Sequence, residues 1–184
     1  LSDGISQHCP AIYKPRRGEA PLWDFPDGTL YLREYAAYLL SEALGWGFVP
    51  PTLTREGVYG MGSVQLFIES DHRSNYFTLR ETHVRECMRT CVFDLIANNA
   101  DRKASHCLLG IDGYVWLIDH GVTFHSEPKL RTVIWDFIGD PIPTWILTDL
   151  RLFLDRFERP GGLRGLLTGP LTPEEVEAFF CRVV

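Results

Sequence analysis

Apolar side chains recur at every third or fourth position in four segments of the chain, the spacing that buries one face of a helix. The first segment has Thr29 as a candidate N-cap and Gly45 where the helix would end. Thr78 and Glu81 have the spacing of a capping box, and Thr172 opens the last segment in the same way. The helices predicted from this pattern span residues 30–44, 78–96, 145–157 and a final segment from 173 onward.

Short apolar runs between glycines and prolines predict strands. The first, at 11–14, is bounded by prolines and ends at Lys14. Asp112-Gly113 suits a two-residue hairpin turn with positive φ. The other predicted strands are 53–55, 58–61 and 64–68, separated by Gly57 and Gly62, and the hairpin pair 107–111 and 114–118. The pattern therefore predicts an α+β protein with a small sheet, one helix against it, a mainly helical second part and a β-hairpin.

A polar stretch without periodicity at 70–76 predicts a connector between two parts of the chain. We place the boundary near Glu69, which gives an N-terminal lobe of residues 1–69 and a C-terminal lobe of residues 70–184. The 184 residues and the 45% hydrophobic content are enough to bury a core in one domain or in two small, closely packed lobes.

Charge and cysteine usage narrow the class of protein. A net charge of -6 argues against a broad nucleic-acid-binding face, and a small anionic ligand suits the local cluster Lys14, Arg16 and Arg17 better. No apolar run approaches the length of a membrane span, and residues 1–10 lack the basic start and apolar core of an export signal. Five cysteines without regular spacing do not form a disulfide framework. We expect a cytoplasmic protein without stable membrane insertion.

Two carboxylates bracket the predicted hairpin. Asp101 precedes it and Asp119 follows it, so the antiparallel strands would return both side chains to the same place. A phosphoryl-transfer site needs one carboxylate to orient the acceptor hydroxyl, another to hold magnesium against the phosphates, and a cation to neutralise the transferred group. Asp101, Asp119 and Lys14 fill those three roles.

Four motifs follow one another in an order that a known superfamily shares. They are Ala-Ile-Tyr-Lys-Pro at 11–15, Val-Gln-Leu-Phe-Ile-Glu at 64–69, Asn-Ala-Asp-Arg at 99–102 and Leu-Ile-Asp-His-Gly at 117–121. In this order they are similar to a phosphate-binding lysine strand, the strand that enters an interlobe hinge, a catalytic loop and a metal-binding D-x-G element. The chain thus resembles the small bacterial phosphatidylinositol 3- and 4-kinase-like proteins of the protein-kinase-like superfamily.

The resemblance implies a two-lobed kinase-like fold, ATP as substrate and Mg²⁺ as metal. It makes Glu34 the partner of Lys14, with Glu42 as the competing acid on the same helix. The remaining roles that it implies are Asp101 and Arg102 in the catalytic loop, Gln65, Phe67, Ile68 and Glu69 around the nucleotide base, and Asp119 on the metal.

Two features depart from the family pattern. His106 stands where the kinase loop places a metal-binding Asn; because magnesium prefers oxygen ligands, His106 indicates an altered second metal site or a preference for Mn²⁺. Only thirteen residues precede Lys14, too few for a glycine-rich strand-turn-strand, which indicates a reduced or truncated N-terminal part. Loop 16–27 is the candidate substitute for cradling the phosphates.

Several functions stay open at this point. The main hypothesis is an ATP-dependent kinase for an unidentified protein, lipid or small-molecule hydroxyl, since related folds phosphorylate all three. Lys129 and Arg131 would meet an anionic acceptor. The alternatives are a nucleotide-binding pseudokinase or regulatory module and an AMP transferase. A zinc or iron site built from His106, Asp119, His120 and His125 is a further reading, although no compact metal motif is present.

Overall fold

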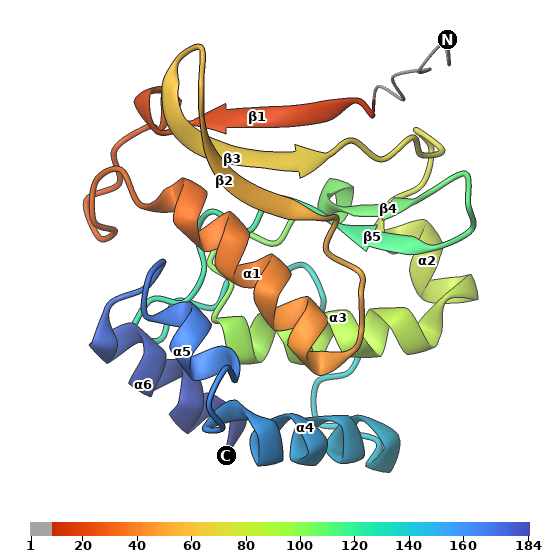
Figure 1. Cartoon of the computed structure of the whole chain (residues 1–184). Helices are drawn as coiled ribbons and strands as arrows, with labels where there is room; N and C mark the ends of the chain where they lie inside the picture. The colour runs from red at the N-terminus through yellow and green to blue at the C-terminus, as the bar shows by residue number, and fades with distance from the viewer. Residues whose placement is uncertain (1–8) are drawn as a thin grey trace, which may run out of the picture.

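A three-stranded antiparallel sheet lies over a long helix at one end of the molecule (Figure 1). The computed structural model describes residues 9–184; residues 1–8, which hold most of the segment judged to lack an export signal, lie outside this range. The strands are β1 (Ala11–Pro15), β2 (Thr52–Gly57) and β3 (Gly60–Leu66), in the order β1-β3-β2. Helix α1 (Leu30–Leu44) packs beneath β2 and β3 and ends, as predicted, at Gly45 in the left-handed conformation.

The prediction of two separate strands at 58–61 and 64–68 is wrong, because Val58 and Tyr59 form the turn and β3 runs unbroken through Gly62. Gly62 is required by a close approach of two strands. A Cβ atom at this position would lie 2.5 Å from the carbonyl oxygen of Lys14 on β1. The glycine therefore lets β1 pair closely with β3 and does not end a strand.

The second predicted helix is two helices, α2 (Tyr76–Thr82) and α3 (Val84–Ala97), which meet at His83. Its predicted capping box at Thr78 and Glu81 is also wrong. Asn75 is the N-cap, and the hydroxyl of Thr78 accepts a hydrogen bond from the Asn75 backbone N–H. Helix α3 runs across the lower half of the molecule, and α2 lies at its right-hand end (Figure 1).

The predicted β-hairpin forms, with strands β4 (Cys107–Leu109) and β5 (Val115–Leu117), but its turn is longer than two residues. The Gly110 N–H donates to the carbonyl of Tyr114, and only Gly113 in the loop has positive φ. This three-residue loop matches a hairpin in which a turn is followed by a left-handed glycine. Asp112 stabilises it by accepting the N–H of Tyr114.

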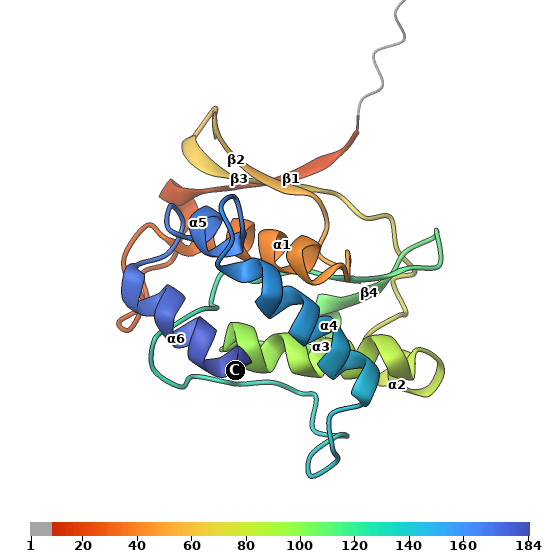
Figure 2. The same ribbon diagram turned by 60° about the horizontal axis from the view of Figure 1, so that its bottom comes forward.

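Three further helices complete the fold: α4 (Thr144–Phe157), α5 (Leu163–Leu167) and α6 (Pro173–Val183). Short 3₁₀ turns η1 (Arg16–Gly18) and η2 (Ala104–His106) follow β1 and precede β4. Sequence reasoning found α4 and α6, with its capping box at Thr172 and Glu175, and missed α5. Figure 2 shows α4 in front of α3, with α6 to their left and α1 above them.

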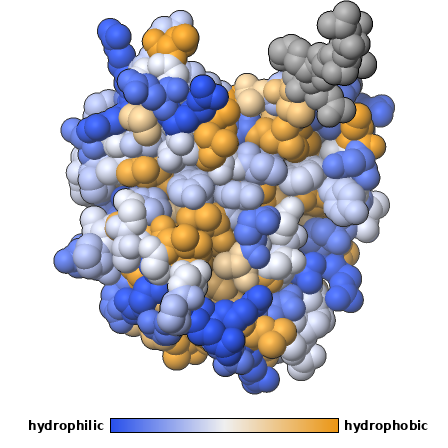
Figure 3. Space-filling view, in the orientation of Figure 1, coloured by the Kyte–Doolittle hydropathy of each residue, from blue (hydrophilic) through white to orange (hydrophobic). Residues whose placement is uncertain are grey.

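One continuous hydrophobic core joins α1 to the helices that follow it. Ala36 and Leu40 of α1 belong to the same buried cluster as Phe153 of α4 and Phe179 of α6. A buried ion pair between Arg33 of α1 and Glu175 adds a polar link. Apolar surface on the face of Figure 1 gathers near the middle, with polar residues around it (Figure 3). The boundary near residue 69 stays a prediction.

None of the helices in the described range is both long and apolar enough to cross a membrane.

Candidate active site

The amine of Lys14 joins two carboxylates that come from distant parts of the chain. Its Nζ lies 2.6 Å from Oε1 of Glu34 on α1 and 2.5 Å from Oδ1 of Asp119, which follows β5. Lys14 alternates along β1 with Tyr13, so it lies on the sheet face opposite to the tyrosine. The strand period thus directs the amine toward α1 and Asp119, as the sequence predicted. Glu42, the competing acid, is exposed and has no such contact among residues 9–184.

The second oxygen of Glu34 holds the D-x-G segment, residues 119–121, in place. Oε2 accepts the backbone N–H of His120 at 3.0 Å, while Oε1 accepts from Lys14. Asp119 adopts a left-handed conformation with φ 59°, one that Asp and Asn tolerate better than most residues. One carboxylate on α1 therefore positions both the lysine strand and the residue next to Asp119.

The charges at this junction stabilise one another. Burial alone would lower the pKa of Lys14, but the carboxylates of Glu34 and Asp119 outweigh it and the pKa is raised. Burial would likewise raise the pKa of Asp119, but the charge and hydrogen bond of Lys14 outweigh it and the pKa is lowered. At neutral pH the lysine is therefore a cation and the aspartate an anion.

The loop that carries Asp101 is tied to the segment of Asp119 on both sides. The N–H of Ala100 donates to the carbonyl of Val122 at 2.9 Å. On the other side, the guanidinium of Arg102 donates to the carbonyl of Ile118 at 3.1 Å. Asp101 and Asp119 therefore lie on two segments that are hydrogen-bonded to each other, as we expected from the hairpin. Asp101 itself is partly exposed and pairs with Lys103, whose Nζ lies 2.8 Å from its Oδ2.

Arg102 is buried and faces away from solvent, although the resemblance placed it among the catalytic residues. Its Nε and one terminal nitrogen each lie 2.8 Å from a carboxylate oxygen of Asp94 on α3. Asn99 also donates to Asp94, at 2.9 Å, and the ring Nε2 of His120 lies 2.8 Å from Arg102. This buried network, Asp94, Asn99, Arg102 and His120, fixes the catalytic-type loop against α3 and the D-x-G segment.

His106 lies beside Asp119 at the end of η2. Its Nε2 is 3.4 Å from Oδ2 of Asp119, so a nitrogen and an oxygen donor face the same point. Burial lowers the pKa of His106 despite the attraction of Asp119, which keeps the ring neutral and able to bind a metal. Within residues 9–184 no three His, Cys, Asp or Glu side chains form a metal-binding group. Asp119 and His106 thus offer one oxygen and one nitrogen ligand at the same point of the site.

The other histidines of the zinc or iron reading have different partners. His120 is fully buried against Arg102 and Phe93. The Nε2 of His125 lies 2.8 Å from the carbonyl of Asp24, and its Nδ1 accepts the N–H of Glu127. The four side chains of that reading do not converge on one point.

The predicted base-binding residues lie in the segment that leaves β3. The side chain of Gln65 is buried and donates to Thr52, so it stabilises the sheet. Phe67 is 47% exposed, and its backbone N–H donates to Pro10. In the described part of the chain, Ile68 makes no recorded backbone hydrogen bond, whereas the carbonyl of Glu69 accepts from Ile111. Within residues 9–184, Ile68 is thus a position whose N–H and carbonyl both lack a backbone partner.

Loop 16–28, which joins β1 to α1, packs against the segment after the D-x-G element. Lys129 pairs with Asp24 at 3.3 Å and lies over the ring of Trp23. Phe25 packs edge-on against His125. Lys129 is therefore engaged within the protein, while Arg131, the other predicted acceptor contact, is exposed. These contacts place the loop beside α1 and the 125–129 segment.

Sequence reasoning named Lys103 only as a structural ion-pair partner of Asp101, and it missed Asp94. Lys103 stands two positions after Asp101, and its side chain is 60% exposed. Only its spacing from Asp101 signalled a role. Asp94 lies within the apolar stripe of α3 and is buried. An acidic residue in such a stripe indicates a buried partner, and this was the signal that could have identified it.

Acidification should destabilise the protein through His120. Burial lowers the pKa of this ring well below its usual value, and Arg102 lowers it further. The unfolded ring takes up a proton below about pH 6.5, so this contribution to stability is present above that pH and is lost as the pH falls. We expect the Tm to drop by about 3 °C more between pH 7.5 and 5.5 for the native protein than for His120→Gln. Equal pH slopes in thermal melts of the two proteins would contradict this role.

Sequence comparisons with known proteins identify the family of this chain. The sequence profile described as phosphatidylinositol 3- and 4-kinase matches residues 31–166, a range that includes Glu34, Asp101 and Asp119 but not Lys14. Protein Rv2133c of Mycobacterium tuberculosis is 38% identical over 208 aligned residues, which cover 94% of this chain and 73% of that protein. Phosphatidylinositol 4-kinase gamma 4 of Oryza sativa subsp. japonica is 34% identical over 123 residues, covering 56% of this chain and 22% of the plant protein. The chain belongs to the phosphatidylinositol 3- and 4-kinase family.

Proposed function

We propose that the chain is an ATP-dependent phosphotransferase that transfers the terminal phosphoryl group to a hydroxyl acceptor. The observation that carries the proposal is the meeting of Lys14, Glu34 and Asp119, from β1, α1 and the segment after β5, within 2.6 Å contacts. A cation held between two carboxylates, one of them partly exposed, is an arrangement that phosphoryl transfer uses and that a purely structural surface pair seldom needs.

Each residue has a distinct role in the proposal. Lys14, positioned by Glu34, neutralises phosphate charge, and Lys103 adds a second, exposed cation beside Asp101. Asp101 accepts the proton of the acceptor hydroxyl or orients that hydroxyl. Asp119, with His106 at its side, holds a divalent metal, which when bound neutralises charge that develops on the phosphates. Arg102 is a positioning residue, because its donors are used within the protein.

The nucleotide base is assigned to the segment after β3. The backbone N–H and carbonyl of Ile68, which have no backbone partner in the described range, support this, since a base pairs with such groups. Ile12 lies on the same sheet face as Lys14 and is 44% exposed, so it offers apolar surface to the base. Phe67 lies next to Ile68, and its partly exposed side chain adds further apolar surface.

The test is incubation with γ-labelled and α-labelled ATP in Mg²⁺ or Mn²⁺, with protein, lipid and small-molecule hydroxyls offered in parallel. Transfer of the γ label alone supports the kinase assignment. Transfer of the α label would indicate an AMP transferase, and binding without transfer would indicate a regulatory module. Either of these outcomes would overturn the proposal.

Asp101→Asn should lower kcat by about a hundredfold or more while nucleotide affinity changes little, because the carboxylate acts on the acceptor. Single-turnover transfer and equilibrium nucleotide binding measure the two effects. Asp71→Asn is the control, since Asp71 is a partly exposed acid that pairs with Arg73 away from this junction. A normal rate for Asp101→Asn would remove Asp101 from the mechanism.

A further inference from the structure

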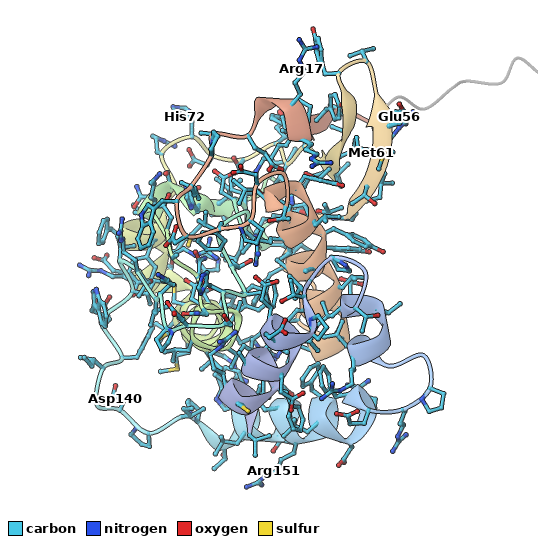
Figure 4. All side chains as sticks on the ribbon, turned by 90° about the vertical axis from the view of Figure 1, so that its left-hand side faces the viewer. Arg17, Glu56, Met61, His72, Asp140 and Arg151 are labelled. Carbon is cyan, nitrogen blue, oxygen red and sulfur yellow. The ribbon has the colours of Figure 1, made fainter. Side chains whose placement is uncertain are left out.

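A hollow of about 560 Å³ lies beside the candidate active site, and Glu19 and Leu30 line both this hollow and the one that contains Lys14 and Glu34. It is formed by loop 16–28, the first residue of α1 and the turn between β2 and β3. Neither Lys14, Asp101 nor Asp119 contributes to it. Figure 4 faces this side of the molecule and shows Arg17 on η1 and Met61 on β3, both at its upper end. The sequence suggested that loop 16–27 cradles the nucleotide phosphates, but none of the residues with a proposed catalytic role lines this hollow.

Two consecutive arginines of η1 line the hollow. Within residues 9–184, neither Arg16 nor Arg17 has a carboxylate at ion-pair distance or a recorded side-chain hydrogen bond. The guanidinium of Arg16 lies against Gly28, where a Cβ atom would overlap its Nε. Gly28 has φ 72°, so the loop tip brings its backbone directly against the arginine. Both arginines are exposed, and within residues 9–184 their side-chain N–H donors have no protein acceptor.

The rest of the wall is largely apolar. Phe25 is buried, with the guanidinium of Arg33 4.9 Å from its ring centroid. Across the hollow, Met61 is 42% exposed and Tyr59 is 63% exposed, although Tyr59 stacks on Tyr13. A volume of this size, with apolar walls and two neighbouring arginines, is typical of sites for small organic ligands.

The charges on the wall favour a compact anion. Two guanidinium groups together match the oxygens of a phosphate better than they match a single carboxylate, which one arginine satisfies. Glu19 and Asp27 also line the hollow, and they disfavour a long polyanion, as does the net charge of -6. Glu19 is already engaged, since its Oε1 accepts the N–H of Tyr31.

We propose that this hollow is a second binding site, separate from the nucleotide site, for a small phosphate monoester with an aromatic or aliphatic body. Arg16 and Arg17 bind the phosphate, while Phe25, Tyr59 and Met61 contact the body. The assignment does not depend on phosphoryl transfer by Asp101 and Asp119. The ligand would bind beside a nucleotide, not in its place.

Calorimetric titration of the full chain with phenyl phosphate tests the site. We expect saturable binding of one equivalent, tighter than binding of inorganic phosphate measured at the same ionic strength. Arg16→Gln and Arg17→Gln should each weaken it about tenfold, since each removes charge-assisted hydrogen bonds. Arg55→Gln, an equal charge change on β2 outside the hollow, should leave the affinity unchanged. Tyr59→Ser should weaken phenyl phosphate binding and leave inorganic phosphate binding as it is.

A second arm separates this site from the nucleotide site. Binding of phenyl phosphate should persist in Asp119→Asn and in the presence of saturating ATP. The proposal is overturned if no binding occurs, if ATP competes it away, or if Lys14→Met abolishes it while both η1 variants bind normally. Thermal melts of each variant show whether it is folded, and the remaining η1 variant tests the site if one fails to fold.

Discussion

Asp119→Asn is expected to lower the rate of metal-dependent phosphoryl transfer by about a thousandfold, the loss of roughly 4 kcal/mol of transition-state stabilisation. Its two oxygens face different partners, Oδ1 toward Lys14 and Oδ2 toward His106. An amide is a neutral and much weaker ligand for a divalent ion than a carboxylate is. His106 alone then offers one nitrogen, which magnesium disfavours.

The substitution should spare the fold. Asn tolerates the left-handed backbone of Asp119 as well as Asp does, whereas Ala would add strain at φ 59°. The side chain is 45% exposed, so loss of its pair with Lys14 should change the free energy of unfolding by less than about 1 kcal/mol. The expected effect therefore lies in catalysis and not in stability.

Nucleotide binding gives the sharpest readout of this variant. In the absence of metal, Asp119→Asn should bind ATP at least as well as the native protein, because the variant removes a negative charge beside Lys14. Added Mg²⁺ or Mn²⁺ should strengthen binding in the native protein and not in the variant. Asp112→Asn, at the far end of the same hairpin, is the matched control. A metal response that survives in Asp119→Asn would remove Asp119 from the metal site.

The sequence predicted those parts of the site that follow from a strand or helix periodicity or from a turn motif. Strand alternation directed Lys14, helical spacing placed Glu34 on α1, and the hairpin at Asp112-Gly113 brought Asp119 back toward Asp101. Each of these placements follows from a local pattern of residues. The pairing of Lys14 with Glu34, by contrast, came from the family resemblance.

The contacts that fix these residues in place were not predictable in the same way. The bond from the His120 N–H to Glu34 spans 86 positions, and no local pattern records it. Gly62 appeared to end a strand because its reason for being glycine lies on β1, in a different part of the chain. His83 interrupts an apolar stripe whose periodicity continues on both sides of it. All three features depend on tertiary packing between segments that are distant in the sequence.

Arg102 is the clearest example, and it carries the largest expected effect on stability. The motif indicated a catalytic arginine, yet the side chain is buried with Asp94. Burial would lower the pKa of Arg102, but the charge of Asp94 outweighs this and the pKa is raised, so the pair remains ionised. Arg102→Met leaves the Asp94 carboxylate buried with only Asn99 to donate to it. We expect a loss of about 3–5 kcal/mol in the free energy of unfolding, or a fall in Tm of about 10 °C.

The double variant Asp94→Asn with Arg102→Met distinguishes a stranded charge from lost packing. Without the carboxylate, no buried ion is left uncompensated, and the amide introduced at position 94 can still pair with Asn99. The double variant should therefore be more stable than Arg102→Met alone by about 2 kcal/mol, even though it carries one more substitution. Denaturant unfolding of the native protein, the two single variants Asp94→Asn and Arg102→Met, and the double variant gives the coupling energy between the two residues. If Arg102→Met melts like the native protein but loses phosphoryl transfer, Arg102 acts on the substrate and the buried network is not what holds the catalytic-type loop.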